Sequence, residues 1–190
     1  GNTNLNPEKS YTNELFAKYN FLNNLSFSST FYRATIFDRI ETNSAYSMHE
    51  NHQIDLNQEG LENELIYKAS DQSLSFFTNF NKSRKTNGQA QSRRPDLNYG
   101  SKYSKKFNNN KYGPFNLILD YKYTGKHVDW DGSKNSKQKS TNIVNLSLSK
   151  KILGGNYFLT ISNLTNERYE RPQTYQQDGR QIRFGLKNNF

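Results

Sequence analysis

The chain has 190 residues, carries a formal net charge of +9 and contains no cysteine. Without cysteine it can form neither a disulfide scaffold nor a thiolate metal site. Its hydrophobic content of 32% is low, but its 13 Tyr and 13 Phe are more aromatic residues than a disordered chain carries. No run approaches the roughly 18 apolar residues of a membrane-spanning helix, which excludes helical spanning. Low hydropathy combined with many aromatic residues is typical of a β-barrel wall.

The positive charge also allows a second interpretation, a soluble basic β-protein that binds nucleic acid. The basic residues, however, are spread from Lys9 to Lys187 and form only small local clusters. Solvated loops and contacts to anionic lipid head groups explain such a distribution more simply. We therefore expect no nucleic-acid partner. The soluble alternative predicts folding without detergent and binding that depends steeply on salt.

Period-two alternation of apolar and polar residues recurs along the chain. Successive side chains of a strand point to opposite faces, so this period predicts strands with one apolar and one polar face. In the last segment Ile182, Phe184, Leu186 and Phe190 share one parity, and polar residues or glycine occupy most of the other positions. The predicted strands are residues 10–19, 25–40, 59–69, 74–82, 98–107, 115–124, 141–152, 156–164 and 180–190.

The connections between these strands are of two kinds that alternate strictly along the chain. Tight turns therefore lie at one end of neighbouring antiparallel strands, and extended loops lie at the other end. Outer-membrane barrels have this organisation, with short periplasmic turns and long outer loops. The short connections are residues 21–24, 70–73, 108–114 and 153–155, and the long polar ones are 41–58, 83–97, 125–140 and 165–179.

Two further features bear on the size of the barrel. The predicted strands are odd in number, whereas single-chain bacterial barrels usually have an even number. The N-terminal residues, which begin at Gly1, lack the charged start and apolar stretch of a signal peptide. We therefore expect residues 1–190 to be the C-terminal part of a larger barrel.

Motifs at four places resemble, in order, elements of the TonB-dependent outer-membrane receptors. The order and spacing are most similar to the vitamin B12 and catecholate-siderophore branch of that family. The last motif is the closing signature, in which an Asn-Leu element is followed by a Gly-Arg pair and a terminal Phe. The four motifs are Gly-Asn-x-x-Leu-x-Pro-Glu-x-Ser at residues 1–10, Asn-x-x-Gly-x-Glu at 57–62, Arg-Arg-Pro at 93–95, and Ile-Ser-Asn-Leu-Thr-Asn-Glu-Arg-Tyr-Glu-Arg-Pro at 161–172 followed by Gly179, Arg180 and Phe190.

This resemblance spans essentially the whole chain and implies an all-β fold. The family's antiparallel transmembrane β-barrel has 22 strands and a plug, and residues 1–190 would supply about the last nine strands. The plug domain, the TonB box and the earlier strands are absent from this sequence. Position 188 is Asn, where the terminal strand usually places an apolar residue. Glu62 and Glu64 share a face that we expect to point into the lumen, where they line a wet wall or meet plug residues.

The resemblance implies active uptake of a large, scarce solute, a cobalamin or a ferric siderophore, across the outer membrane of a Gram-negative bacterium. TonB would act through the plug, and outer-membrane lipid and lipopolysaccharide would surround the barrel. The protein would not be an enzyme and would need no cofactor. The alternative is a small, complete, passive porin-like barrel, which predicts an even strand number and ion conductance.

We assign the family-signature residues to barrel architecture rather than to ligand contact. Gly60 and Gly179 are expected at bends or close backbone approaches where a strand begins. Asn163 is expected to hydrogen-bond neighbouring backbone as its strand leaves the sheet. Tyr169 and Tyr175 suit an outer aromatic belt. The signature residues are Gly60, Asn163, Leu164, Tyr169, Gly179, Arg180 and Phe190.

Substrate contacts are expected from the four long connections. Arginine side chains suit anionic ferric chelates, and aromatic rings suit flat apolar surfaces. The candidate substrate-binding residues are Tyr46, Arg93, Arg94 and Trp130.

No catalytic or metal site is predicted. The segment beginning at Asp129 resembles the start of a calcium loop, but its twelfth position is Ser140 where such a loop needs Glu. His49 and His52 have a spacing compatible with a shared metal, but no third ligand is evident nearby. A solvated loop is the preferred interpretation of both segments. No Gly-x-Ser-x-Gly element of a serine hydrolase is present.

Overall fold

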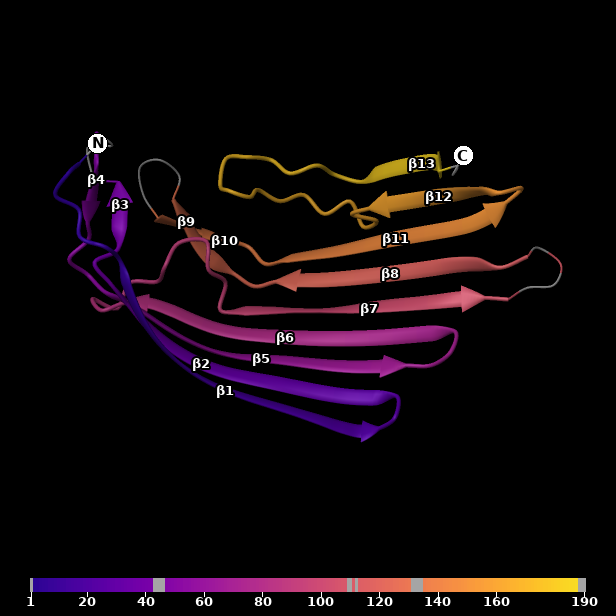
Figure 1. Cartoon of the computed structure of the whole chain (residues 1–190). Helices are drawn as coiled ribbons and strands as arrows, with labels where there is room; N and C mark the ends of the chain where they lie inside the picture. Colours follow the sequence, from indigo (N-terminus) through magenta and orange to yellow (C-terminus); the bar gives the residue numbers. More distant parts are fainter. Residues whose placement is uncertain (1, 43–46, 109–110, 112, 131–134, 188–190) are drawn as a thin grey trace.

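The computed structural model describes residues 2–42, 47–108, 111, 113–130 and 135–187. Nine long strands form one antiparallel sheet in the order β1-β2-β5-β6-β7-β8-β11-β12-β13 (Figure 1). All nine predicted strands are present, which confirms the all-β prediction. The strands are β1 (Lys9–Leu22), β2 (Leu25–Phe37), β5 (Leu56–Lys68), β6 (Gln72–Lys85), β7 (Leu97–Phe107), β8 (Phe115–Thr124), β11 (Thr141–Ile152), β12 (Gly155–Ser162) and β13 (Gln181–Lys187).

The connections alternate between short and long, as predicted. Figure 1 shows the short turns β1–β2, β5–β6, β7–β8 and β11–β12 at one end of the sheet, and the long connections at the other. We call these the short-turn end and the long-loop end. Two small hairpins in the long connections were not predicted, because their strands are only three or four residues long and mostly polar. They are β3 (Ile40–Thr42) with β4 (His49–Asn51), and β9 (His127–Trp130) with β10 (Asn135–Gln138).

Several strands are longer at the long-loop end than the alternation predicts. β5 begins at Leu56 rather than residue 59, and β6 continues to Lys85 rather than residue 82. The ladder continues here through polar pairs such as Gln58 and Ser83, whose side chains form a hydrogen bond of 3.2 Å. The apolar signal ends before the backbone pairing does. Phe190, at the predicted end of the last strand, lies outside the described residues.

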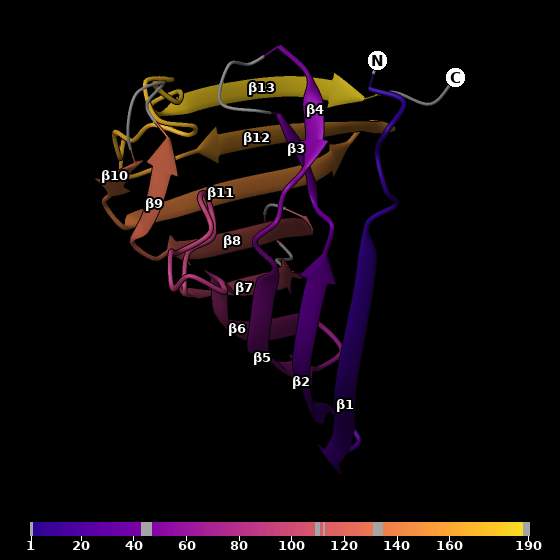
Figure 2. The same ribbon diagram turned by 90° about the vertical axis from the view of Figure 1, so that its left-hand side faces the viewer.

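The sheet is curved like a section of a barrel wall (Figure 2). Its first and last strands, β1 and β13, each have one neighbour in the described sheet and do not pair with one another. Unpaired edges present free backbone N–H and C=O groups, which are not tolerated in contact with hydrocarbon. The sheet is therefore an open arc whose edges need further strands if it stands in a membrane.

Side chains sort onto an apolar face and a polar face. Residues opposite one another in the ladder share a face, so the register places Leu15, Phe31, Leu61 and Phe80 in one row of the apolar face. This face is most exposed towards the two edges of the sheet, for example at Leu15 (71%) in β1 and at Phe184 in β13. Ala34 and Leu56 are the buried hydrophobic residues of the described chain. Among the described residues, no helix is long and apolar enough to cross a membrane.

Three glycines of the polar face lie opposite aromatic residues on the neighbouring strand. The pairs are Gly60 with Tyr32, Gly100 with Phe77, and Gly185 with Phe158. In each pair the ring covers the glycine so closely that a Cβ atom would come within 3 Å of it. Because the Tyr32 ring lies on the polar face, residues 25–40 carry aromatic side chains on both faces and their apolar–polar alternation is imperfect. Gly60 was expected at a bend or a close backbone approach where a strand begins. It lies inside β5, and the group that approaches it closely is the Tyr32 ring.

A side chain at Gly100 would meet backbone as well as a ring, because a Cβ atom there would lie 2.4 Å from the carbonyl oxygen of Tyr121 and 2.7 Å from the Phe77 ring. We expect Gly100→Val to lower the free energy of unfolding by about 1–3 kcal/mol through overpacking. Urea unfolding of the protein in detergent micelles measures this. Ser101→Val, on the opposite face of the same strand, is the control and should change stability much less. Equal unfolding midpoints for the two variants would contradict the assignment.

Candidate functional site

A buried carboxylate joins three of the four long connections. Asp129 lies in β9, and its side chain is only 2% exposed. The Arg93 Nε–H of the β6–β7 connection donates to Asp129 Oδ1 at 2.6 Å, and the backbone N–H of Gln173 in the β12–β13 connection donates to Oδ2 at 2.8 Å. Charge-assisted hydrogen bonds of this kind are about twice as strong as neutral ones. We call Arg93, Asp129 and Gln173 the loop junction.

Further hydrogen bonds reinforce the loop junction. The side-chain oxygen of Gln173 accepts from Gln138 Nε2 at 2.8 Å and from the Ser136 hydroxyl, both in β10. The Arg93 backbone N–H donates to the Val128 carbonyl at 2.8 Å. The three connections therefore bond to one another through both backbone and side chains.

The remaining long connection, between β2 and β5, is tied in through Arg39. This guanidinium is almost fully buried and donates to Glu41 Oε1 at 2.5 Å and to the Ile54 carbonyl at 3.0 Å, both in its own connection. It also lies 3.5 Å from Gln91 Oε1 of the β6–β7 connection. The Thr86 N–H reaches from that connection to the Asp55 carbonyl at 3.0 Å. All four long connections are thus linked in one hydrogen-bonded assembly.

Asn163 organises the start of the β12–β13 connection. Its backbone is left-handed (φ 51°), and β12 ends just before it at Ser162, two residues short of the predicted end at residue 164. Its buried side chain accepts from the Glu167 N–H at 2.8 Å, and its Nδ2 donates to the carbonyls of Glu167 (2.8 Å) and Asp178 (3.3 Å). Asparagine tolerates this conformation better than other side chains. Asn163 thus bonds to backbone groups of the connection that follows its strand.

The Gly-Arg pair closes the same connection. The Arg180 N–H donates to Asn166 Oδ1 at 2.9 Å, and Arg180 Nε donates to the Leu164 carbonyl at 2.8 Å. A Cβ atom on Gly179 would lie 2.6 Å from Asn166 Oδ1, so glycine allows the close approach. The Leu164 N–H in turn donates to the Val144 carbonyl of β11 at 2.7 Å. The motif thus folds the connection back onto the sheet.

A cavity of 280 Å³ lies between the β8–β11 and β12–β13 connections. Tyr169 lines the cavity from the β12–β13 connection, and its backbone carbonyl accepts hydrogen bonds from the Gln177 N–H and the Gln176 side chain. Basic groups outnumber acidic groups in the lining, so the cavity suits an anionic group of a ligand. The charged lining residues are Lys137, Lys139, Arg168 and Arg171, with Glu167 and Glu170 opposite in sign.

The structure places the four candidate substrate residues differently. Arg93 is committed to the loop junction, although its side chain is still 59% exposed. Arg94 beside it is exposed. Trp130 belongs to β9, but its side chain, like the whole of Tyr46, lies outside the described structure. No local pattern indicated the roles of Asp129 and Gln173, because an aspartate in a polar loop is typical of a turn.

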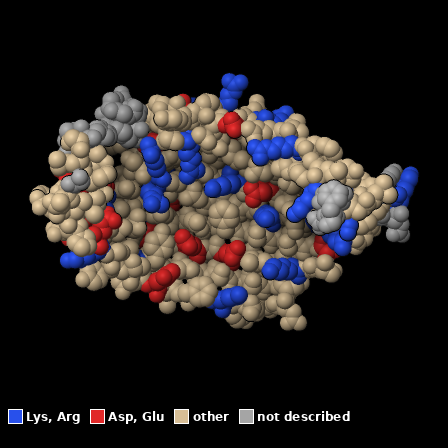
Figure 3. Space-filling model, turned by 45° about the horizontal axis from the view of Figure 1, so that its top comes forward, with Lys and Arg blue, Asp and Glu red and all other residues tan. Residues whose placement is uncertain are grey.

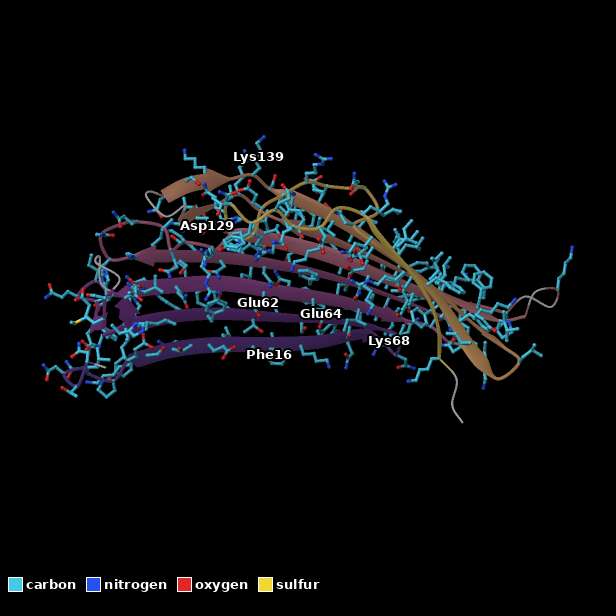
Figure 4. The ribbon with its side chains drawn as sticks, turned by 90° about the horizontal axis from the view of Figure 1, so that it is seen from above. Phe16, Glu62, Glu64, Lys68, Asp129 and Lys139 are labelled. Carbon is cyan, nitrogen blue, oxygen red and sulfur yellow. The ribbon has the colours of Figure 1, made fainter. Side chains whose placement is uncertain are left out.

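Charge is unevenly distributed over the polar face. Glu62 and Glu64 of β5 follow one another about midway along their strand (Figure 4), on the polar face of the sheet. Within the described residues, no ion pair joins either of them to a basic side chain. Basic residues are more frequent over the upper strands and at the right-hand end of the view in Figure 3. By the strand register, the polar face of β7, β8 and β13 carries Lys102, Lys106, Lys122, Arg183 and Lys187.

The two segments considered for metal binding are held in other ways. Asp129 accepts from Arg93 and Gln173 as described above. His52 Nε2 lies 3.7 Å from Glu41 Oε2, whereas His49 lies in β4. Among the described residues no group of three or more His, Cys, Asp or Glu could hold a metal ion.

The loop junction makes a prediction for Asp129→Asn. The substitution keeps one oxygen but removes the charge that Arg93 neutralises, so we expect the junction to lose about 1.5–3 kcal/mol. Amide hydrogen exchange should become faster in residues 86–96 and 163–180 together. Asp71→Asn makes the same chemical change at the short-turn end and should leave both segments unchanged. Faster exchange in only one segment would show that the junction does not couple them.

Asn163 makes a separate prediction. We expect Asn163→Ala to destabilise the β12–β13 connection by about 2–4 kcal/mol, because it removes three hydrogen bonds and places alanine at a positive φ. Asn163→Gly accepts that backbone but also lacks the bonds, so the difference between the variants isolates the backbone cost. Urea unfolding and hydrogen exchange of residues 164–180 are the measurements. Asn156→Ala, at an exposed position of β12, is the control, and a loss as large as that of Asn163→Ala would refute the assignment.

Residues 1–188 match the family described as "TonB dependent receptor-like, beta-barrel". No curated protein sequence matches the chain. The chain is similar to the FrpB iron transporter of Neisseria meningitidis, with 16% identity over 96% of this chain and 31% of that chain and a TM-score of 0.75. It is similar to the ferric yersiniabactin uptake receptor FyuA of Yersinia pestis, with 19% identity over 94% of this chain and 28% of that chain and a TM-score of 0.77. It is also similar to the ferripyoverdine receptor of Pseudomonas aeruginosa, with 16% identity over 96% of this chain and 27% of that chain and a TM-score of 0.79.

At these identities the structural likeness shows the fold alone, and the chain spans 27–31% of the length of these three proteins. The family match covers nearly every residue and agrees with the alternating loops, the two-faced strands and the closing motif. The chain belongs to the TonB-dependent receptor family, and its nine-stranded sheet is barrel wall of such a receptor.

Proposed function

We propose that this chain supplies barrel wall and long loops to a receptor that imports a large, scarce solute across the outer membrane of a Gram-negative bacterium, with TonB supplying the energy. The observation that carries the proposal is the linked assembly of all four long connections at one end of a polar-faced wall. A binding platform must hold its loops in a fixed arrangement, because loops that are ordered only on binding cost affinity.

The open edges of the sheet support a larger barrel. Both β1 and β13 need a further strand if their backbone groups are to be satisfied in lipid. We propose that residues 1–190 are the C-terminal portion of the barrel. Other strands would complete the wall, and a plug domain would fill the lumen. In this arrangement Glu62 and Glu64 meet basic groups of the plug, since carboxylates inside a barrel are stabilised by pairing.

The proposed solute is a ferric siderophore or a cobalamin. The names of the three structural neighbours refer to iron, yersiniabactin and pyoverdine, which supports the ferric chelate for this chain. Its anionic charge would suit Arg94 and the basic lining of the cavity between the β8–β11 and β12–β13 connections. Tyr46 and Trp130 stay candidates for contact with flat apolar parts of the solute. Outer-membrane lipid and lipopolysaccharide would surround the apolar face.

Uptake by intact cells tests the proposal. In a strain lacking the gene, restored with the wild-type copy, we expect uptake of labelled ferric siderophores or of labelled cobalamin to return only when TonB is present. Replacing residues 163–180 by a Gly-Ser linker of equal length should abolish uptake, because it removes one arm of the loop junction. Replacing residues 108–114 at the short-turn end is the matched control and should preserve it.

Two results would contradict the proposal. Uptake of every tested solute could be the same with and without the gene. Uptake could instead persist without TonB and be accompanied by ion conductance of the purified protein in a bilayer, which would favour the passive porin-like barrel.

A further inference from the structure

The polar face carries a lysine near the short-turn end of every long strand that runs towards that end. These strands are β1, β5, β7, β11 and β13, and the five lysines are exposed. In all of these strands except β1, the lysine is the last or the second-to-last residue. The ladder places the five on the same face as Glu62 and Glu64. We call Lys18, Lys68, Lys106, Lys151 and Lys187 the lysine row.

The charge at this end of the sheet has almost entirely one sign. Apart from Asp71 in the β5–β6 turn, every charged residue in the segments next to the short turns is a lysine. Basic side chains gather accordingly at the right-hand end of Figure 3. Within the described residues, no ion pair joins a member of the lysine row to a carboxylate. The segments compared are residues 18–28, 66–75, 104–118, 147–158 and 185–187.

Two recesses hollow the sheet beside the lysine row. One of 680 Å³ has Lys18 and Lys68 in its lining, and one of 480 Å³ has Lys68 and Lys106. Neutral groups of the same face lie between these lysines, for example Ser73 and Ser104, whose hydroxyls are 2.8 Å apart. A hydroxyl can donate a hydrogen bond to a carboxylate that a lysine attracts. The recesses therefore suit the acidic side chains of a partner.

The spacing of the lysine row favours an extended partner. Its members stand on alternate strands, so the backbones of neighbouring members are at least about 10 Å apart, which is twice the distance between paired strands. A small anion reaches one or two adjacent lysines, whereas the row crosses the whole sheet from β1 to β13. A polypeptide surface that carries several separate carboxylates matches the full row.

The position of the lysine row on the polar face shows where this partner would lie. The polar face points away from the apolar rows, so the row faces the interior of a closed barrel rather than lipid. Glu62 and Glu64 lie on the same face, and Figure 4 shows Glu62, Glu64 and Lys68 in this order towards the short-turn end. A partner inside the barrel is therefore complementary only if it is basic at the glutamates and acidic at the lysine row.

We infer that the lysine row binds an acidic polypeptide segment inside the barrel, with separate Asp or Glu side chains of the segment at the individual lysines. The inference rests on the proposed function, because in such a receptor this segment belongs to the domain that fills the lumen. The glutamates and the lysine row together then fix the depth and the orientation of that domain. A shift or an inversion of the domain would bring like charges together, which is unfavourable.

Carbodiimide cross-linking of the full-length receptor in detergent micelles, without added solute, tests the inference. The reagent joins a lysine amine to a carboxylate where the two groups are in contact. We expect peptide mass spectrometry to find Lys106 and Lys151 joined to Asp or Glu residues outside residues 1–190. Lys105 and Lys150 are matched controls, because they are adjacent in sequence but lie on the apolar face. They should form no such cross-link.

A charge variant supplies a second measurement. The triple variant Lys68→Gln, Lys106→Gln, Lys151→Gln removes three ion pairs, each contributing about twofold, so amide hydrogen exchange in the cross-linked acidic peptides should become roughly eightfold faster. The corresponding triple arginine variant keeps the charges and should exchange as wild type does. The double variant Lys105→Gln, Lys150→Gln changes charge on the opposite face and should also leave the exchange unchanged.

Two cross-linking results with the wild-type receptor would overturn the inference, and neither depends on a variant that folds. One is the absence of cross-links from the lysine row to residues outside 1–190, and the other is an equal yield from Lys105 and Lys150. Protection of the row from acetylation by an added ferric siderophore, without such cross-links, would assign the row to the solute instead. Cross-links in a receptor that imports nothing would contradict the proposed function alone, and TonB-dependent uptake without cross-links would contradict this inference alone.

Discussion

Backbone hydrogen bonding in a medium without water is the constraint on which this structure depends. In hydrocarbon each unpaired N–H or C=O costs several kcal/mol, so a spanning wall must be a continuous ladder. The nine strands meet this requirement in a fixed antiparallel register, and the alternation of side chains then follows. Leu15 and Phe184 can be exposed because lipid is their solvent. The unpaired backbone groups at the edges of β1 and β13 would be costly in hydrocarbon. Neighbouring strands of a complete barrel would pair with them.

The two ends of the wall meet this constraint in different ways. At the short-turn end the strands reverse within a few residues, and left-handed positions such as Leu153 and Gly154 suffice for the turn. The long connections have too few apolar residues for a hydrophobic core. Buried charges take its place: Asp129 and Arg39 are nearly inaccessible, and each is bonded to groups from more than one segment. Removing one partner of such a group is costly, so the loops are held together as a unit.

The sequence was most informative where one face meets lipid, because burial in lipid imposes period two on residues such as Phe115, Leu117 and Leu119. The alternation of loop lengths was equally readable. It was least informative at the long-loop end. The pairing of Arg93 with Asp129 spans 36 residues, and nothing local distinguishes these side chains from solvated ones. The β3–β4 and β9–β10 hairpins were missed for the same reason, since their strands carry no apolar row. Asn163 was predictable because its bonds are local.

The charges of the polar face limit how a solute can cross the proposed receptor. An anionic chelate held by basic groups at the long-loop end would next meet Glu62 and Glu64, which lie midway along the wall. Two carboxylates in a confined lumen repel an anion. A plug with basic groups against them would neutralise this repulsion and would hold the barrier closed by ion pairs. Opening would then require work to separate those charges, which is the kind of load that an energy-coupling partner such as TonB can supply and diffusion of the solute cannot.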